Sequence, residues 1–175
     1  TIAAVKLDDD EIAAGLQEDA DEGPVDEPLL DNVTLPTYDD AALRQIKEDQ
    51  NDGIIKTCIQ YINGSLPLPA KTEALSLPQP IQHFLRHKGN FRLTTQGVLI
   101  RLWTLKTGSI DILLVVGDDA LQRILKSTHE FAVGNNNSGA HVGQRKTMSI
   151  VSRRYYAFHL REKVNKYVKL CPVCS

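Results

Sequence analysis

Two histidines and a closing Cys-x-x-Cys are the residues of this sequence whose types and spacing are best suited to chemistry. His129 and His141 lie upstream of Cys171 and Cys174, and no cysteine other than this pair follows residue 58. A tetrahedral Zn²⁺ site needs four nitrogen or sulfur donors, and a Cys-x-x-Cys knuckle supplies two thiolates at a fixed separation. The sequence therefore predicts one zinc site; the alternative is a pair of unliganded thiols with two surface histidines.

The remaining cysteine and two further histidines have simpler interpretations. Cys58 lies on the apolar face of a predicted helix, where a lone thiol usually behaves as a small core residue. His83 and His87 are four residues apart on another predicted helix and in principle share a metal. Because no acid or cysteine lies near them in the sequence, we expect both histidines to be exposed.

The small net charge of −2 conceals a strong asymmetry along the chain. Residues 1–31 contain eleven acids and a single base, whereas residues 121–175 contain ten bases and two acids. Such asymmetry is typical of an acidic tail combined with a basic surface that meets polyanions. For the acidic end, a solvated segment without a partner is the simpler interpretation.

Composition narrows the class of protein. Hydrophobic residues make up 42% of 175 residues and aromatic residues only 6%, which predicts a modest, mainly aliphatic core. The sequence has no apolar run of about 18 residues and no signal-peptide pattern, so we expect no membrane partner. Three cysteines, two of them in one knuckle, favour a reducing, intracellular compartment with metal over a disulfide framework.

The elements that must position the four candidate ligands follow from hydrophobic periodicity and caps. An acidic leader over 1–36, with a weak helix between 9 and 16, is expected to be largely disordered because it has little apolar area to bury. A helix capped by Thr37 or Asp39 and a second helix capped by Asp52 form a hairpin. After a proline-rich link, a short helix spans 81–85.

The hydrophobic period then changes to that of strands. Runs at 91–94, 98–105 and 110–116 are separated by turn signals and predict three antiparallel strands that bury one face on the preceding helices. A helix capped by 117–119 ends at His129, an Asn/Gly-rich loop spans 134–139, and two more helices follow, the first of them closed by 153–156. The fold class is α+β: a helical hairpin with a small three-stranded sheet, then a zinc-stabilised three-helix module.

The pattern around the ligands resembles a known family. The signature Gly139-x-His141-x-Gly143-x-x-x-Thr147, the aromatic pair Tyr155-Tyr156, Tyr167-Val168 and Cys171-Pro172-Val173-Cys174 are similar to the HHCC zinc-binding domain of retroviral and LTR-retrotransposon integrases. This resemblance covers 118–175. Residues 37–117 are similar to the extension domain that precedes the zinc domain in gypsy-type and spumavirus-like integrases, and the leader is similar to the linker before it.

Two departures from the family pattern leave the fourth ligand open. Eleven residues separate His129 from His141, which is longer than the family's usual spacing, so His129 reaches the metal only if the Asn/Gly-rich loop bulges outward. Ala157-Phe158-His159 stands where the family commonly has Trp after the aromatic pair. His159 is therefore an alternative to His129, which we favour because it lies at a helix end.

The resemblance implies an integrase N-terminal module that binds Zn²⁺ and the element's DNA ends and assists multimerisation. Its expected partners are those DNA ends, the integrase catalytic core and further copies of the chain, in the nucleus and, before integration, in a cytoplasmic particle. We expect no small-molecule substrate and no catalytic residues, since the family's catalytic core would lie downstream. The expected phosphate contacts are basic side chains of the last two helices and the turn between them: Arg145, Lys146, Arg153, Arg154, Arg161, Lys163 and Lys166.

Two other functions remain as alternatives. One is a domesticated host copy in which the same module acts as a protein-protein interaction domain in the nucleus. The other is a zinc-dependent nuclease, which we rank last because Asp118 and Asp119 are better explained as a helix cap than as metal ligands.

Overall fold

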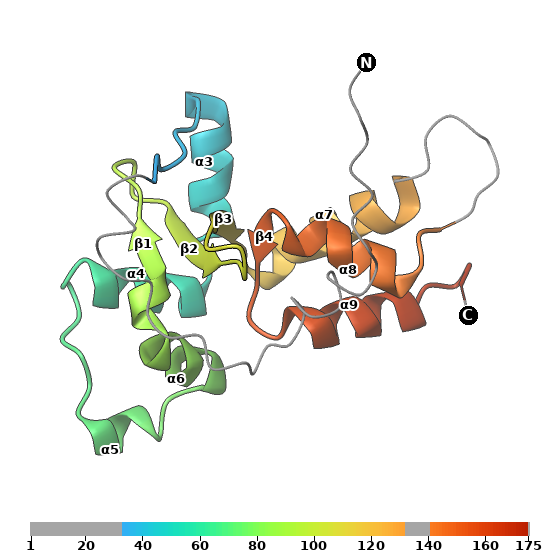
Figure 1. Ribbon diagram of the computed structural model, residues 1–175. Coiled ribbons are helices and arrows are strands. Elements are labelled where there is room, and N and C mark those ends of the chain that lie inside the picture. Colours follow the sequence, from blue (N-terminus) through green and yellow to red (C-terminus); the bar gives the residue numbers. More distant parts are fainter. Residues whose placement is uncertain (1–32, 132–140, 175) are drawn as a thin grey trace.

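A four-stranded sheet lies at the centre of the molecule, with helices on both of its faces and a three-helix group beside its β4 edge (Figure 1). This computed structural model describes residues 33–131 and 141–174. The expected leader over 1–32, including its weak helix, and the predicted loop over 134–139 lie outside the described residues. Helices and strands together confirm the α+β class.

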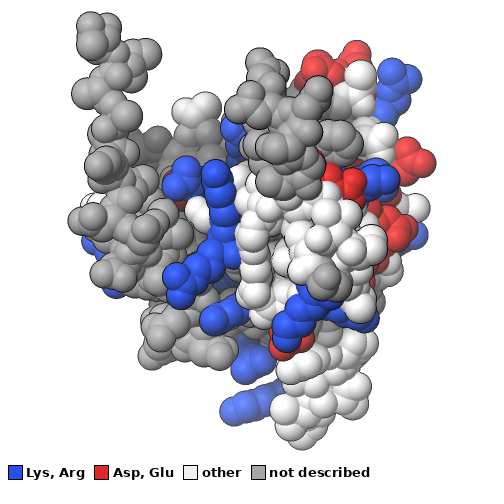
Figure 2. Space-filling view, turned by 90° about the vertical axis from the view of Figure 1, so that its right-hand side faces the viewer, with Lys and Arg blue, Asp and Glu red and all other residues white. Residues whose placement is uncertain are grey.

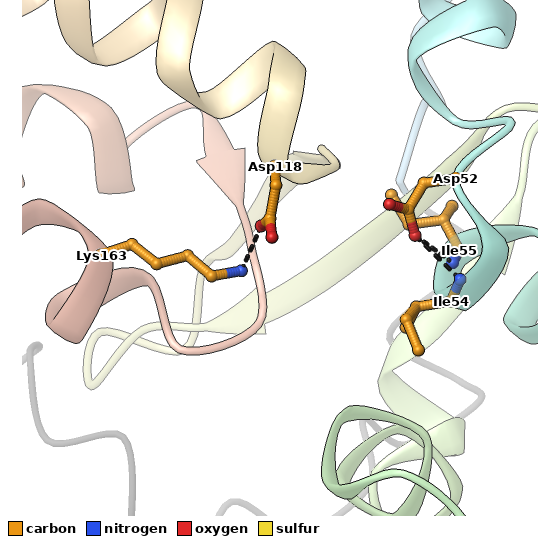
Figure 3. Close-up of polar contacts among 5 residues, drawn as sticks. All are labelled: Asp52, Ile54, Ile55, Asp118 and Lys163. Atoms are coloured by element: carbon orange, nitrogen blue, oxygen red, sulfur yellow. Dashed lines mark hydrogen bonds and ion pairs between the residues drawn. The ribbon is translucent and has the colours of Figure 1, made fainter.

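The first two described helices begin where the sequence predicts. Helix α3 (Asp40–Asp49) starts after Asp39. The Asp39 carboxylate accepts hydrogen bonds from the backbone N–H groups of Ala41 at 3.0 Å and Ala42 at 2.8 Å. Helix α4 (Gly53–Ile62) starts after Asp52, which accepts from the N–H groups of Ile54 and Ile55 (Figure 3). Both caps satisfy donors that a helix leaves unpaired at its first turn.

Two short helices follow the proline-rich link. Helix α5 (Lys71–Ala74) is an addition to the prediction, and α6 (Gln79–Arg86) is the expected short helix, followed by the 3₁₀ turn η1 (Lys88–Asn90). The expectation that His83 and His87 are exposed is wrong: both are half-buried, and Nε2 of His83 is fully covered. Position on the helix alone did not reveal this, because the cover comes from Phe158, far along the chain, whose ring meets the His83 ring edge-on at 6.2 Å.

The predicted strands form an antiparallel meander, to which the structure adds a fourth strand. Strands β1 (Phe91–Leu93), β2 (Leu99–Thr104) and β3 (Ile110–Val115) pair in order, and Gly97 and Gly108 occupy the left-handed positions of the two turns. Strand β4 (Tyr155–Tyr156) pairs in parallel with β3. The sequence pattern predicts these tyrosines at a helix end; a two-residue strand exists only through its tertiary partner.

Each face of the sheet carries its own core. One face packs on α4 and α6 through Leu99, Leu113 and Val115, and the other packs on α3 and the preceding extended residues through Ile100 and Leu102. The alternation of these residues along the strands follows the period of two expected for a sheet buried on both faces. Residues 33–36, assigned to the leader from the sequence, lie outside any helix or strand, with two of their side chains packed on this second core.

A buried amide ties the first helix to the sheet. Gln50, 3% exposed, donates from Nε2 to the carbonyl oxygens of Leu99 and Val115, both at 2.8 Å, and accepts from the N–H of Leu99 at 2.9 Å. All three bonds reach backbone groups that the sheet leaves unpaired. The end of α3 is therefore fixed to the start of β2 and the end of β3.

The last part of the chain forms three helices around a separate core. Helices α7 (Asp118–Phe131), α8 (Gln144–Ser152) and α9 (Leu160–Lys169) bury a common cluster that includes Leu121, Leu125, Val151 and Val164. Because helices this short seldom hold together by packing alone, the cluster explains the arrangement only in part.

The connection between α8 and α9 crosses into the neighbouring core. Tyr156 and Phe158 belong to the cluster formed by α4, α6 and the sheet. The Arg101 guanidinium, on β2, lies 4.3 Å from the Tyr156 ring centroid and 4.7 Å from that of Trp103. The parts of the chain before and after the predicted boundary between 117 and 118 therefore contact each other. They share the core that contains Tyr156 and Phe158, and they share the pairing of β3 with β4.

No helix among the described residues is both long enough and apolar enough to cross a membrane.

Candidate metal centre

Four side chains from three separate places in the chain converge at the outer end of the three-helix group. His129 lies near the end of α7, His141 lies just before α8, and Cys171 and Cys174 follow the end of α9. One ligand atom from each residue lies within 4.8 Å of all the others. The structure thus brings together the four residues predicted from the sequence.

His129 is held in one tautomer and one orientation by its neighbours. Its ring is 0% exposed, and Nδ1–H donates to the Val142 carbonyl oxygen at 2.7 Å. The backbone returns the contact, because the N–H of Val142 donates to the His129 carbonyl oxygen at 3.0 Å. With Nδ1 occupied, Nε2 presents its lone pair to the centre of the cluster, as in many histidine ligands of zinc.

A buried threonine also binds the backbone of Val142 and Gly143, the segment to which His129 is hydrogen-bonded. Thr147, 0% exposed, donates through Oγ1 to the carbonyl oxygens of Val142 at 3.0 Å and Gly143 at 3.1 Å. The Val142 carbonyl therefore accepts from both the ring of His129 and the hydroxyl of Thr147. This explains physically why a threonine stands six residues after His141 in the signature.

The Cys-x-x-Cys knuckle is a tight turn that follows α9. The N–H of Cys171 donates to the Val168 carbonyl oxygen and the N–H of Cys174 to the Cys171 carbonyl oxygen, at 3.3 and 3.1 Å. Burial acts to raise the pKa of the Cys171 thiol, but the neighbouring His129 ring and the backbone N–H groups of Val173 and Cys174 outweigh it and lower that pKa. A thiolate is the form of cysteine that binds a metal.

The pKa of the second thiol, that of Cys174, is shifted in the opposite direction. Burial, then the hydrogen bond and charge of Cys171, raise the pKa of Cys174. Two thiolates side by side repel each other, and a divalent cation between them relieves that repulsion.

Tyr167 and Glu130 support the site from α9 and α7. The Tyr167 ring meets the His129 ring edge-on, with 5.8 Å between centroids, and its hydroxyl donates to Oε1 of Glu130 at 3.1 Å. Burial, and next the Glu130 carboxylate, raise the pKa of Tyr167 to about 12. The Tyr167 hydroxyl therefore stays protonated and donates its hydrogen bond to Glu130. This bond connects α9 to α7 beside His129.

The donor set fits zinc. Zn–N bonds of about 2.0–2.1 Å and Zn–S bonds of about 2.3 Å at tetrahedral angles place ligand atoms roughly 3.3 to 3.8 Å apart. His141 Nδ1 lies 3.2 Å from His129 Nε2 and 3.0 Å from Cys171 Sγ, and Cys174 Sγ lies 3.5 Å from His129 Nε2. Two nitrogens and two sulfurs so close together form a closed site of the structural type, which leaves no open position for a substrate.

His159, the alternative ligand, lies elsewhere. It adopts a left-handed backbone conformation, with φ of 58°, immediately before α9. Cys171 follows the far end of that ten-residue helix, whose length is about 15 Å at 1.5 Å per residue. The helix therefore separates His159 from the cysteines, and His129 completes the site.

The predicted phosphate contacts cover the outside of the same helices. Six of the seven are exposed: Arg145 and Lys146 on α8, Arg153 and Arg154 after it, and Arg161 and Lys166 on α9. Figure 2, which views the side where α8 and α9 lie in Figure 1, shows lysine and arginine side chains gathered in a band on this face. The contact of these residues with DNA stays a prediction.

Lys163 has a different local role from the other six. Its ammonium pairs with the Asp118 carboxylate at the start of α7 (Figure 3). This pair joins the N-terminal ends of α7 and α9. Both of these ends lie away from the zinc ligands. It also gives Asp118, which lies in the first turn of α7, an ion-pair partner.

Sequence reasoning missed the residues that orient the ligands. Thr147, Tyr167 and Glu130 were visible as part of the pattern or as plain polar residues, yet no contact was assigned to them. A threonine at a buried helical position was the available signal for Thr147, because a buried hydroxyl requires a hydrogen-bond partner.

One comparison with known proteins bears on this site. Residues 116–175 match the family model described as integrase zinc binding domain. No curated protein and no solved structure matches the chain. The matched range contains all four ligands and all three helices that they join, so the site lies entirely within the part of the chain that is similar to integrase zinc-binding domains.

Proposed function

We propose that this chain is the N-terminal region of a retroelement integrase, in which the zinc-binding domain binds the element's DNA ends and assists assembly of the integrase multimer. The observation that carries this proposal is the four-ligand cluster inside the residues that match the integrase zinc-binding family. The proposed setting is the nucleus, with the DNA ends, the integrase catalytic core and further copies of this chain as partners.

Zinc serves this function by fixing three helix ends relative to one another. When bound, the ion is held by the ends of α7 and α9 and by the residue before α8, and it contributes folding free energy to a small module. The basic side chains on α8 and α9 are then presented in one fixed arrangement. Fixed lysines and arginines lose less conformational freedom when they contact phosphates.

An apolar surface beside the knuckle supports a role in assembly. Leu170, directly after α9, and Val173, inside the knuckle, are 70% and 64% exposed. Large apolar side chains exposed close to a structural metal site favour contact with another protein surface. Together with the family match, this supports a binding role for these residues, with no catalytic step assigned to them.

DNA binding is tested by its dependence on salt. Affinity of the full chain for a duplex should fall steeply with ionic strength, because each phosphate contact releases counterions. Reversing two exposed charges, Arg145→Glu with Lys146→Glu, should reduce the slope of log K against log salt by about 2. The matched control is Lys106→Glu, an exposed lysine in the turn between β2 and β3, which should leave the slope unchanged.

The same titration separates the proposal from its main alternative. Absence of duplex binding at low salt, or an affinity that does not respond to salt, would contradict DNA binding and favour a protein-protein interaction module.

A further inference from the structure

An open recess lies on the β3–β4 side of the sheet, next to the extended residues before α3. Its volume is about 330 Å³, at the lower end of the range typical of ligand sites, about 300–1,000 Å³. Three segments supply its eight lining residues: Thr34, Pro36 and Tyr38 before α3, Ile112 and Leu114 on β3, and Arg153, Arg154 and Tyr155 at the start of β4.

The walls of this recess are built into the fold. The side-chain amide of Gln96, in the turn between β1 and β2, donates to the Tyr38 carbonyl oxygen and accepts from the Tyr38 N–H, both at 2.8 Å. Val33 and Leu35 anchor the same segment by packing on the sheet. On the other side, the Leu114 N–H donates to the Arg154 carbonyl oxygen at 2.9 Å. Backbone bonds thus fix both sides of the recess.

The lining combines flat apolar surface with positive charge. Proline, isoleucine, leucine and the two tyrosine rings provide the apolar part, and two exposed arginines lie beside it. None of the eight lining residues carries a carboxylate. Burial, followed by the nearby Tyr155, raises the pKa of Tyr38, so its hydroxyl remains a neutral hydrogen-bond donor. Apolar faces with guanidinium groups fit a ligand that is both flat and anionic.

We propose that this recess binds an unpaired nucleotide of a DNA end, with its base against the apolar and tyrosine surface and its phosphate on Arg153 and Arg154. Bases inside a duplex are stacked and cannot enter a recess, so the ligand is a nucleotide in a single-stranded overhang. The inference rests on the proposed DNA binding and deepens it. Five of the eight lining residues precede residue 116, so the site lies largely outside the integrase zinc-binding match.

The arginine pair connects the recess to the rest of the basic surface. Both arginines belong to the predicted phosphate contacts, and they lie between α8 and α9, whose exposed bases form the remainder of that set. A duplex lying along these helices would bring its strand end toward the recess. An acidic apolar peptide, including the chain's own segment before residue 33, is the competing occupant that the experiment must distinguish.

The test compares two labelled duplexes that carry the same number of phosphates, one blunt and one with a three-nucleotide overhang, with 5′ and 3′ overhangs tried separately. The full-length chain loaded with zinc should bind one overhang polarity at least about fivefold more tightly than the blunt duplex, since stacking contributes about 1–3 kcal/mol per base. Thr34→Trp, which fills the recess, should abolish this preference without changing blunt-duplex affinity. Thr37→Trp, an exposed threonine of the same segment outside the lining, should keep it.

Two results would overturn the inference while leaving the proposed function intact. One is equal affinity for blunt and overhang duplexes in the unaltered chain; the other is an overhang preference that survives Thr34→Trp in a variant with normal zinc content and thermal unfolding. Binding of a synthetic peptide of residues 18–32 that requires Arg154, together with no overhang preference, would assign the recess to an acidic peptide instead. Absence of binding to any duplex at low salt would overturn both proposals.

Discussion

The four zinc ligands depend on neighbours that are not ligands. At His129, one ring nitrogen is occupied by the Val142 carbonyl oxygen, and Thr147 holds that carbonyl in place. The second ring nitrogen faces His141 and Cys174. Outer contacts of this kind typically change metal affinity by about 10- to 100-fold when removed.

Zinc content should distinguish the two candidate histidines. We expect the unaltered chain to hold one zinc ion, His129→Ala to lose it, and His159→Gln to keep it, because His159 lies at the opposite end of α9 from the cysteines. Elemental analysis of protein purified without chelator measures all three. A His159→Gln variant without zinc, together with a His129→Ala variant that retains it, would reverse the assignment.

At the scale of elements, helix α6 shows how a distant segment changes the chemistry of a local one. His83 is packed edge-on against Phe158, and its ring lies 4.5 Å from that of His87. Its Nε2 is covered and has no hydrogen-bond partner among the described residues. A histidine in this position is best accommodated neutral.

The titration of His83 should follow from this packing. Burial first, and then the charges of His87, Arg101, Arg86 and His159, lower the pKa of His83 to about 4. Because the unfolded chain takes up the proton at higher pH, the stability that neutral His83 contributes is present above about 6.5 and is lost as pH falls toward 4. Histidine ring NMR should show the low pKa directly.

A matched variant isolates the contribution of this side chain. In His83→Gln, the free energy of unfolding at saturating zinc should fall less steeply between pH 6.5 and 4 than in the unaltered chain. A His83 ring that titrates near 6.5 would contradict the burial argument.

At the scale of the whole molecule, the zinc-binding part and the preceding α+β part are joined through the sheet. The N–H groups of Leu114 and Val116 donate to the carbonyl oxygens of Arg154 and Tyr156, both at 2.9 Å. Phe158 adds a ring to the core shared by α4 and α6. Loss of zinc should therefore be felt at the β3 edge as well as in the three helices.

Hydrogen exchange of Cys171→Ser should show this coupling. We expect zinc to be lost, protection to fall throughout α7, α8 and α9, and exchange at Leu114 and Val116 to increase, because β4 directly follows α8 and connects it to α9. Amides of β1 and β2 should remain protected. The control is Cys58→Ala, a buried cysteine of the other core that should leave zinc content unchanged. Unchanged protection at Leu114 and Val116 in Cys171→Ser would show that the two parts are independent.

Local sequence information determined the longer helices, three of the strands and three of the four zinc ligands. The caps at Asp39 and Asp52 and the turns at Gly97 and Gly108 depend on contacts within a few residues, which a sequence records directly. The Cys-x-x-Cys knuckle and His141 could also be predicted from the sequence, because ligands of this type of zinc site are cysteines or histidines at a characteristic spacing.

Only the tertiary structure decided contacts between residues far apart in the chain. It selected His129 over His159, since the choice depends on which end of α9 the cysteines occupy. It also created β4, buried His83, and joined Tyr38 and Arg154 in one recess. A two-residue strand has no local signal, and the cover over a side chain comes from whichever segment packs against it. The sequence by itself thus determined three of the ligands, His141, Cys171 and Cys174. Packing determined the fourth ligand, the orientation of the ligands and the residues that surround them.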